Sequence, residues 1–281
     1  MELALLFAAG VVGGIMNSIA GGGSFITFPA LMAVGVPPIM ANATNTYAAC
    51  AGYISGAVGF REEILKNKQE LLFTVSFSLV GGAVGAYLLL NTPESLFLEA
   101  IPWLLLFATL LFLTGSRLTM IIKSITREHK HAGVLGLIAL SLLLVGVSAY
   151  GGFFNAGLGV IVLSYLVVAG HQDINLMNGL KLLVSTCVSL IAIVIFVANG
   201  SIDWSKGSVV MVGTLVGGYL AARVSRQLNP SHVKGFVALS SIIITIYFLL
   251  TFTPNPNRKS AINLMALLRL SIKVSKKKFI K

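Results

Sequence analysis

The sequence predicts an all-α integral membrane protein with about eight transmembrane helices in two homologous repeats, each containing a glycine-rich helix break. Three observations support this fold class. Of the 281 residues, 56% are hydrophobic and only 10% are charged, whereas an ordinary soluble domain carries about 25% charged residues. The apolar residues form runs of transmembrane length, and the two halves of the chain align with each other. Such a composition excludes soluble enzymes, nucleic-acid binders and disulfide-stapled secreted domains.

Eight hydrophobic stretches approach the roughly 20 residues that a helix needs to cross a bilayer. They cover residues 3–20, 38–60, 70–90, 97–115, 132–150, 174–198, 207–224 and 233–252. Two shorter apolar runs, Phe25–Val34 and Val160–Ala169, each follow a glycine cluster. These two runs are too short to cross alone, so we expect half-helices or re-entrant segments.

An internal duplication is visible when each residue is compared with the residue 136 positions later. The alignment needs no gap over about sixty positions. Identical pairs include Gly21 and Gly157, Gly23 and Gly159, Asn42 and Asn178, and Phe60 and Phe196. Internal repeats of this kind are common in secondary transporters. The chain is therefore expected to consist of a first transmembrane repeat (1–122), a second transmembrane repeat (132–252) and a basic C-terminal tail (253–281).

Loop charges bear on the orientation, because Lys and Arg concentrate in cytoplasmic loops. The loop 61–68 carries three Lys or Arg, and the central linker 117–130 carries four, so we expect both to be cytoplasmic. The tail carries eight, with leucines between them, which suggests a basic surface helix on an anionic lipid leaflet. Two topologies remain open. Eight spans with the tail inside place 16 Lys or Arg inside and three outside, whereas inverted repeats place 10 inside and nine outside.

Residues that could carry catalysis are scarce, so we expect neither an enzyme nor a bound cofactor. There is no CxxC, no paired carboxylates within a span and no Walker-type phosphate loop. His129 and His131 could suggest a metal, but no Cys or Asp lies at ligand spacing from them. A solvated cytoplasmic loop is the favoured interpretation, and we predict no metal site.

Glycines and polar residues inside the apolar spans are the candidate substrate-binding residues. A helix break followed by a half-helix leaves free N–H groups and a positive dipole end, which attract anions. Close helix packing through small residues is the alternative, but two breaks at one offset favour a binding site. Gly10 lies mid-span with no break around it, so a side chain there should do less damage. The candidates are Gly21, Gly22, Gly23, Ser24, Asn42, Thr44 and Asn45 in the first half and Asn155, Gly157, Gly159 and Asn178 in the second.

Lys181 completes this candidate set, because it is the only ionisable residue well inside a predicted span. A charged residue at that depth is costly and marks a functional site by default, although snorkelling to the interface is the alternative. Its counterpart at the offset of 136 is Asn45, so we expect a lysine and an amide to face each other between the repeats. No Asp or Glu lies deep in a span. These features favour an anionic substrate.

Several motifs resemble the sulfite exporter TauE/SafE family over about residues 5–252. In the first half they are Gly21–Leu31, Gly35–Pro38, Ala41–Thr46 and Gly56–Arg61, and in the second half Gly151–Gly157, Met177–Lys181, Asp203-Trp204 and Gly217–Arg223. The resemblance implies a bacterial inner-membrane transporter, usually drawn with eight spans, that moves sulfite, sulfonates or related small organic anions without ATP. The tail lies outside the family pattern, and Asn155 and Gly179 stand where Gly and Ala are expected.

The function predicted from these observations is secondary transport of a small anion, with sulfite, a sulfonate or another organosulfur anion as the favoured substrate and alternating access as the mechanism. An anion channel and a non-transporting membrane scaffold or receptor are the alternatives. The expected partners are the anion and membrane lipid, with no nucleic acid.

Overall fold

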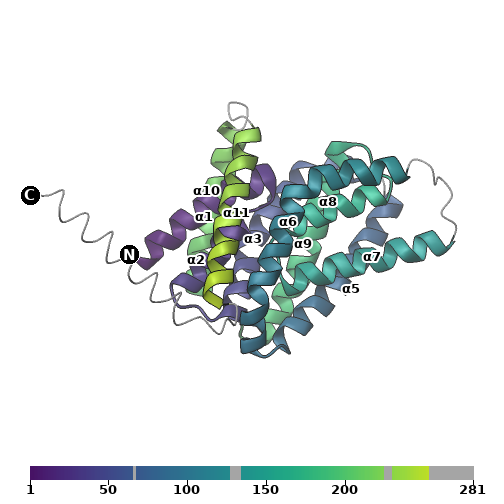
Figure 1. Ribbon diagram of the computed structural model, residues 1–281. Helices are drawn as coiled ribbons and strands as arrows, with labels where there is room; N and C mark the ends of the chain where they lie inside the picture. The colour runs from purple at the N-terminus through teal and green to yellow at the C-terminus, as the bar shows by residue number, and fades with distance from the viewer. Residues whose placement is uncertain (66–67, 127–133, 225–229, 253–281) are drawn as a thin grey trace, which may run out of the picture.

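The computed structural model describes residues 1–65, 68–126, 134–224 and 230–252 (Figure 1). The regular structure of these residues is entirely helical. Eleven helices follow in chain order: α1 (Glu2–Ala20), α2 (Ser24–Ala33), α3 (Pro38–Gly59), α4 (Arg61–Leu65), α5 (Lys68–Leu90), α6 (Glu94–Thr126), α7 (Val134–Phe153), α8 (Leu158–Val168), α9 (Ile174–Ala198), α10 (Trp204–Val224) and α11 (Pro230–Phe252). The all-helical prediction is confirmed, while the tail and its expected lipid contact lie outside the described residues.

The helix breaks lie where the glycine clusters predict them. Gly21 ends α1 with a φ of +77°, and Gly157 precedes α8 with a φ of +79°. Glycine adopts this left-handed conformation without the Cβ clash that other residues suffer. Both short helices begin directly after these clusters, at Ser24 and Leu158.

Four helices contain a segment that is long and apolar enough to span a membrane. These segments are Leu71–Leu90, Glu94–Thr114, Gly136–Phe153 and Asn175–Ala198. Shorter apolar segments, Glu2–Asn17 and Ala238–Phe252, lie in α1 and α11. The structure therefore confirms a multi-helix membrane protein, and the number of eight spans stays a prediction.

A helix start recurs at the offset seen in the sequence. The helix α3 begins at residue 38, and α9 begins 136 residues later, at 174. Thr109 of α6 and Thr245 of α11 are also 136 residues apart, and their Oγ1 atoms lie within 2.9 Å of each other in a hydrogen bond. Two residues at equivalent positions can touch in this way where a two-fold axis passes between them.

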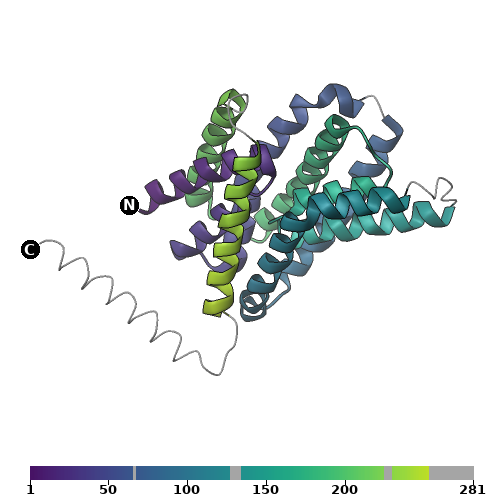
Figure 2. The same ribbon diagram turned by 45° about the horizontal axis from the view of Figure 1, so that its top comes forward.

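The helices α6 and α11 run in opposite directions where they cross, as both ribbon views show (Figures 1 and 2). Aromatic contacts link the start of α6 to the end of α11. Phe97 lies 6.4 Å from Phe154, Phe154 lies 5.6 Å from Phe28, and Phe28 stacks on Phe248 at 6.4 Å, all between ring centroids. These buried rings form the core beneath both helix breaks.

Two groups of helices are visible in Figure 1, and each contains helices from both halves of the sequence. In one group α1 packs along α10, and in the other α5 packs along α7. Glycines allow the close approach in both groups, because a Cβ at Gly217 would collide with the Val11 carbonyl and one at Gly85 with the Ala149 carbonyl. The helices α3 and α9 pack against each other between the two groups.

Candidate functional site

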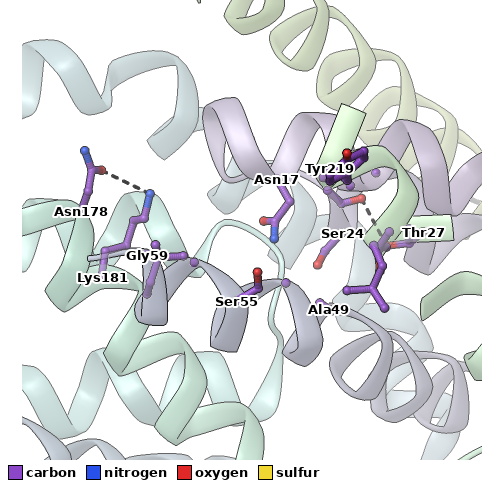
Figure 3. Close-up of a pocket in the computed structure, with 18 of the residues that line it drawn as sticks. Asn17, Ser24, Thr27, Ala49, Ser55, Gly59, Asn178, Lys181 and Tyr219 are labelled. Atoms are coloured by element: carbon purple, nitrogen blue, oxygen red, sulfur yellow. Dashed lines mark hydrogen bonds between the residues drawn. The ribbon is translucent and has the colours of Figure 1, made fainter. Parts of the chain in front are cut away.

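A cavity of about 670 Å³ opens beside the first helix break (Figure 3). Its walls come from the end of α1, the start of α2, one face of α3, the start of α9 and the middle of α10. The lining residues are Gly13, Gly14, Asn17, Gly23, Ser24, Thr27, Ala49, Gly52, Ser55, Gly56, Gly59, Phe60, Asn178, Lys181, Leu182, Thr214, Leu215, Gly218 and Tyr219. Four of the predicted site residues are among them: Gly23, Ser24, Asn178 and Lys181.

The small residues of α3 explain why the cavity is open on this side. Gly52, Ser55, Gly56 and Gly59 each lie three or four positions from two others of the set, so they share one face of the helix. A helix face without large side chains leaves space between α3 and the neighbouring helices. The small residues of this face thus leave the cavity open.

One end of the cavity is formed by hydroxyl groups that a buried amide positions. The Asn45 side chain donates from Nδ2 to Ser24 Oγ at 3.1 Å and accepts a hydrogen bond from Thr27 Oγ1. Asn45 itself is 1% exposed and does not line the cavity. It therefore acts on the cavity through Ser24 and Thr27, which both line it.

Lys181 lies at the other end of the cavity (Figure 3). Its Nζ donates to Asn178 Oδ1 at a long distance of 3.4 Å. Gly159 lies beside the aliphatic stem, because a Cβ at this glycine would be 3.5 Å from Lys181 Cδ. The expected face-to-face pair of Lys181 and Asn45 is not formed, since the cavity separates Lys181 from the Ser24 and Thr27 hydroxyls (Figure 3).

Two polar residues that the sequence reasoning missed also face the cavity, Asn17 and Ser55 (Figure 3). Within the described part of the chain neither side chain has a hydrogen-bonding partner. Both stand between Lys181 and the Ser24 end, where they are available to a ligand. The signal for Asn17 was its place just before a glycine cluster, and Ser55 stands one position before Gly56 on the glycine-rich face of α3.

Charge within the cavity is of one sign. Of the described lining residues, Lys181 alone carries a charge, and the polar groups around it are amides and hydroxyls. Amides and hydroxyls donate hydrogen bonds readily to the oxygens of an anion. No cluster of three or more His, Cys, Asp or Glu that could hold a metal ion is found in the described ranges.

Comparison with known proteins places this architecture in a family. The sequence profile described as "Sulfite exporter TauE/SafE" matches residues 6–248. The chain belongs to the TauE/SafE family. A "Probable membrane transporter protein" of Haemophilus influenzae is 29% identical over 250 residues, which cover 86% of this chain and 92% of that protein. The "Probable membrane transporter protein YfcA" of Escherichia coli K12 is 26% identical over 245 residues, covering 86% and 88% of the two chains. No solved structure matches. This TauE/SafE protein is a membrane transporter.

The remaining predicted residues of this TauE/SafE transporter lie outside the cavity. Thr44 accepts a hydrogen bond from the Asp203 backbone N–H at 3.0 Å, and so fixes the start of α10. Asn155 accepts from Tyr53 Oη at 2.9 Å and donates to Ser189 Oγ at 3.4 Å. Gly21, Gly22 and Gly157 belong to the breaks themselves, Asn42 lies in α3, and none of the four lines the cavity.

In the second half of the TauE/SafE protein, two counterparts of the lining residues are aromatic. Tyr150 and Phe153 stand where the first half has Gly14 and Asn17. The Tyr150 ring packs edge to face against Phe107 and Phe154, and its hydroxyl donates to the Ala156 carbonyl at 2.8 Å. These aromatic side chains stand at positions where the first half has a glycine and an asparagine that line the cavity.

Proposed function

We propose that this TauE/SafE transporter is a secondary carrier of a small anion, with sulfite, a sulfonate or another organosulfur anion as substrate. The observation that carries the proposal is Lys181, a lone positive charge in a cavity whose other polar groups are neutral. An anion is the ligand that such a charge attracts, and an amide is its only hydrogen-bonding partner among the described residues. No carboxylate among the described lining residues competes with it.

The size of the cavity favours an anion with an organic body over a bare inorganic ion. Small-molecule sites commonly measure about 300–1,000 Å³, and this cavity measures about 670 Å³. An anionic head at Lys181 would leave the Asn17 and Ser55 side chains to bind further polar atoms of the substrate. The family name supports the sulfur-containing class, and the polar lining supports sulfonate oxygens as acceptors.

Alternating access by the rocking of one group of helices against the other is the mechanism that we propose. The starts of α3 and α9 at an offset of 136 and the hydrogen bond between Thr109 and Thr245 support a duplicated fold with a two-fold axis. The opposite directions of α6 and α11 favour inverted repeats, as in many secondary transporters. The relatives come from bacteria such as Haemophilus influenzae and Escherichia coli, so we place the protein in a bacterial inner membrane.

The experiment that tests the function compares substitutions of two lysines, one that lines the cavity and one that does not. Purified protein is reconstituted into liposomes, and binding and uptake of sulfite, ethanesulfonate, thiosulfate and acetate are measured. Lys181→Ala removes a charge-assisted hydrogen bond worth about 1.5–3 kcal/mol, so affinity should fall roughly 10- to 150-fold. Lys181→Arg should also impair binding, because a planar guanidinium does not replace a compact ammonium.

Lys206→Ala is the matched control. Lys206 forms a 3.1 Å ion pair with Asp203 at the start of α10 and does not line the cavity. Its removal lowers the net charge by the same amount, so binding should persist. Equal loss in the Lys181 and Lys206 variants would refute the assignment, and so would saturable transport of a cation.

A further inference from the structure

The second helix break is tied to α3 by a hydrogen bond between side chain and backbone. Asn42 donates from Nδ2 to the Phe153 carbonyl at 3.0 Å, at the end of α7. That carbonyl belongs to the last turn of a helix, where backbone oxygens lack partners from their own helix. The amide of Asn42 therefore binds the end of α7 to α3. We call a helix break closed when this bond is formed and open when it is not. Tyr53, also on α3, adds a second bond to the same segment through Asn155.

At the first helix break the corresponding hydrogen bond is not formed. Counterparts of Asn42 and Phe153 at the offset of 136 are Asn178 and Asn17. Asn178 does not reach the Asn17 carbonyl, and its Oδ1 accepts from Lys181 instead. The Asn17 carbonyl accepts only the Gly21 N–H, at 3.1 Å, among the described residues. Asn178 and Asn17 both line the cavity, on opposite sides of the space between α9 and α1 (Figure 3).

The packing around the left-handed glycine also differs between the two breaks. A Cβ at Gly157 would lie 2.9 Å from Ala108 Cβ, so the second break is packed against α6. No atom lies within 4 Å of the corresponding position at Gly21. Open space therefore adjoins Gly21 but not Gly157. By contrast, Gly23, at the other end of the first break, packs on α1, because a Cβ there would collide with the Gly13 carbonyl oxygen.

We infer that Asn178 is a positioning residue that closes the first break over the substrate once an anion has taken its place beside Lys181. The inference rests on the proposed function. In the ligand-free protein Lys181 holds Asn178 by a hydrogen bond. An anion that binds the Lys181 ammonium releases the amide, which then donates to the Asn17 carbonyl as Asn42 does to that of Phe153. Substrate binding and closure of the cavity are coupled through one side chain.

Ala49 provides a reporter for this closure. It lines the open cavity, whereas its counterpart Ser185 in the closed half is 2% exposed. Ala49→Cys in a background with Cys50→Ala and Cys187→Ala gives a single thiol, whose labelling rate with a maleimide measures how open the first break is. The label reacts quickly when the break is open and slowly when it is closed.

A ligand-free arm tests the release of Asn178 directly. Lys181→Met removes the amine and keeps an unbranched apolar stem, so Asn178 becomes free to close the break. A hydrogen bond of ordinary strength predicts labelling slower by roughly two- to tenfold. Adding Asn178→Ala to Lys181→Met should restore the fast rate. Unchanged labelling in Lys181→Met would overturn the inference, and so would equally slow labelling in the double variant, because the cavity would then have collapsed without the amide.

A ligand arm separates a positioning role from direct substrate binding. Ethanesulfonate should slow labelling of the reporter protein, since it does not itself consume maleimide as sulfite does. Asn178→Ala should bind ethanesulfonate at least as tightly, because Lys181 has lost a competing partner, but should show no slowing. Asn178→Asp should bind it poorly, because the carboxylate pairs with Lys181. Loss of binding in Asn178→Ala would make Asn178 a substrate ligand and overturn the inference. If no anion of the panel binds the unmodified chain, the proposed function fails, and the ligand-free arm still decides whether Asn178 closes the break.

Discussion

Replacement of Gly10 by Ala tests how much the packing of α1 on α10 depends on the close backbone contact at this glycine. A Cβ at Gly10 would lie 2.6 Å from the Val210 carbonyl oxygen and 3.0 Å from Gly213 Cα. Ordinary contacts begin at 3.4 Å, so the two helices must separate locally by about 0.8 Å. Overpacking of this kind costs about 1–3 kcal/mol. The gain in helix propensity from Gly to Ala, about 1 kcal/mol, offsets part of that cost.

Gly146→Ala is the matched control, because Gly146 stands 136 positions after Gly10, in α7, and no atom lies within 4 Å of its Cβ position. The two variants share the gain in helix propensity, so the difference between their free energies of unfolding reports the clash alone. We expect Gly10→Ala to unfold more easily than Gly146→Ala by about 1–3 kcal/mol. Thermal unfolding of the purified proteins in detergent, followed by fluorescence and by the fraction that stays monodisperse, measures the order. Equal stability of the two variants, or a less stable Gly146→Ala, would refute the packing argument.

Three further predictions concern the site and the topology. Asn45→Asp should weaken anion binding in an equilibrium titration, since it removes the donor to Ser24 and brings a negative charge near the cavity; tighter binding would contradict an anionic substrate. Gly157→Ala should destabilise the protein more than Gly21→Ala in the same unfolding assay, because both strain a left-handed residue by about 1–2 kcal/mol but only Gly157 also meets Ala108. A reporter fused at Lys281 should lie on the opposite side of the membrane from one inserted in the central linker, because α6 and α11 cross antiparallel; reporters on the same side would exclude the inverted arrangement.

The fold was largely accessible from the sequence because its signals are local. Continuous apolar runs predict the helices, and glycine clusters predict where two of them break. The offset of 136 predicted the matching starts of α3 and α9 at residues 38 and 174. Each of these signals depends on neighbouring residues or on a simple comparison of the chain with itself.

The candidate site was predicted only in part, because side-chain direction depends on tertiary packing. Thr44 and Asn45 are neighbours in sequence, yet Thr44 holds the start of α10 while Asn45 positions the hydroxyls of the cavity. Ser55 and Asn17 carry no motif, and only the arrangement of α1, α3 and α9 brings them to the cavity. A side chain at Gly10 was expected to do less damage than one at a helix break, but the distance to Val210 predicts a clash that no local pattern reveals.

The exchange of helices between the two halves dictates an order of assembly during synthesis. Gly10 of α1 meets Gly213 of α10, so 203 positions of chain separate the two contacting glycines. At roughly 5–20 residues per second, α1 waits about 10–40 s for its main packing partner to leave the ribosome. Gly85 of α5 and Ala149 of α7 are only 64 positions apart, so their wait is about 3–13 s. The group built on α5 and α7 can thus assemble while the glycine-lined face of α1 is still exposed to lipid or to the insertion machinery, and the cavity can form only after α10 has been made.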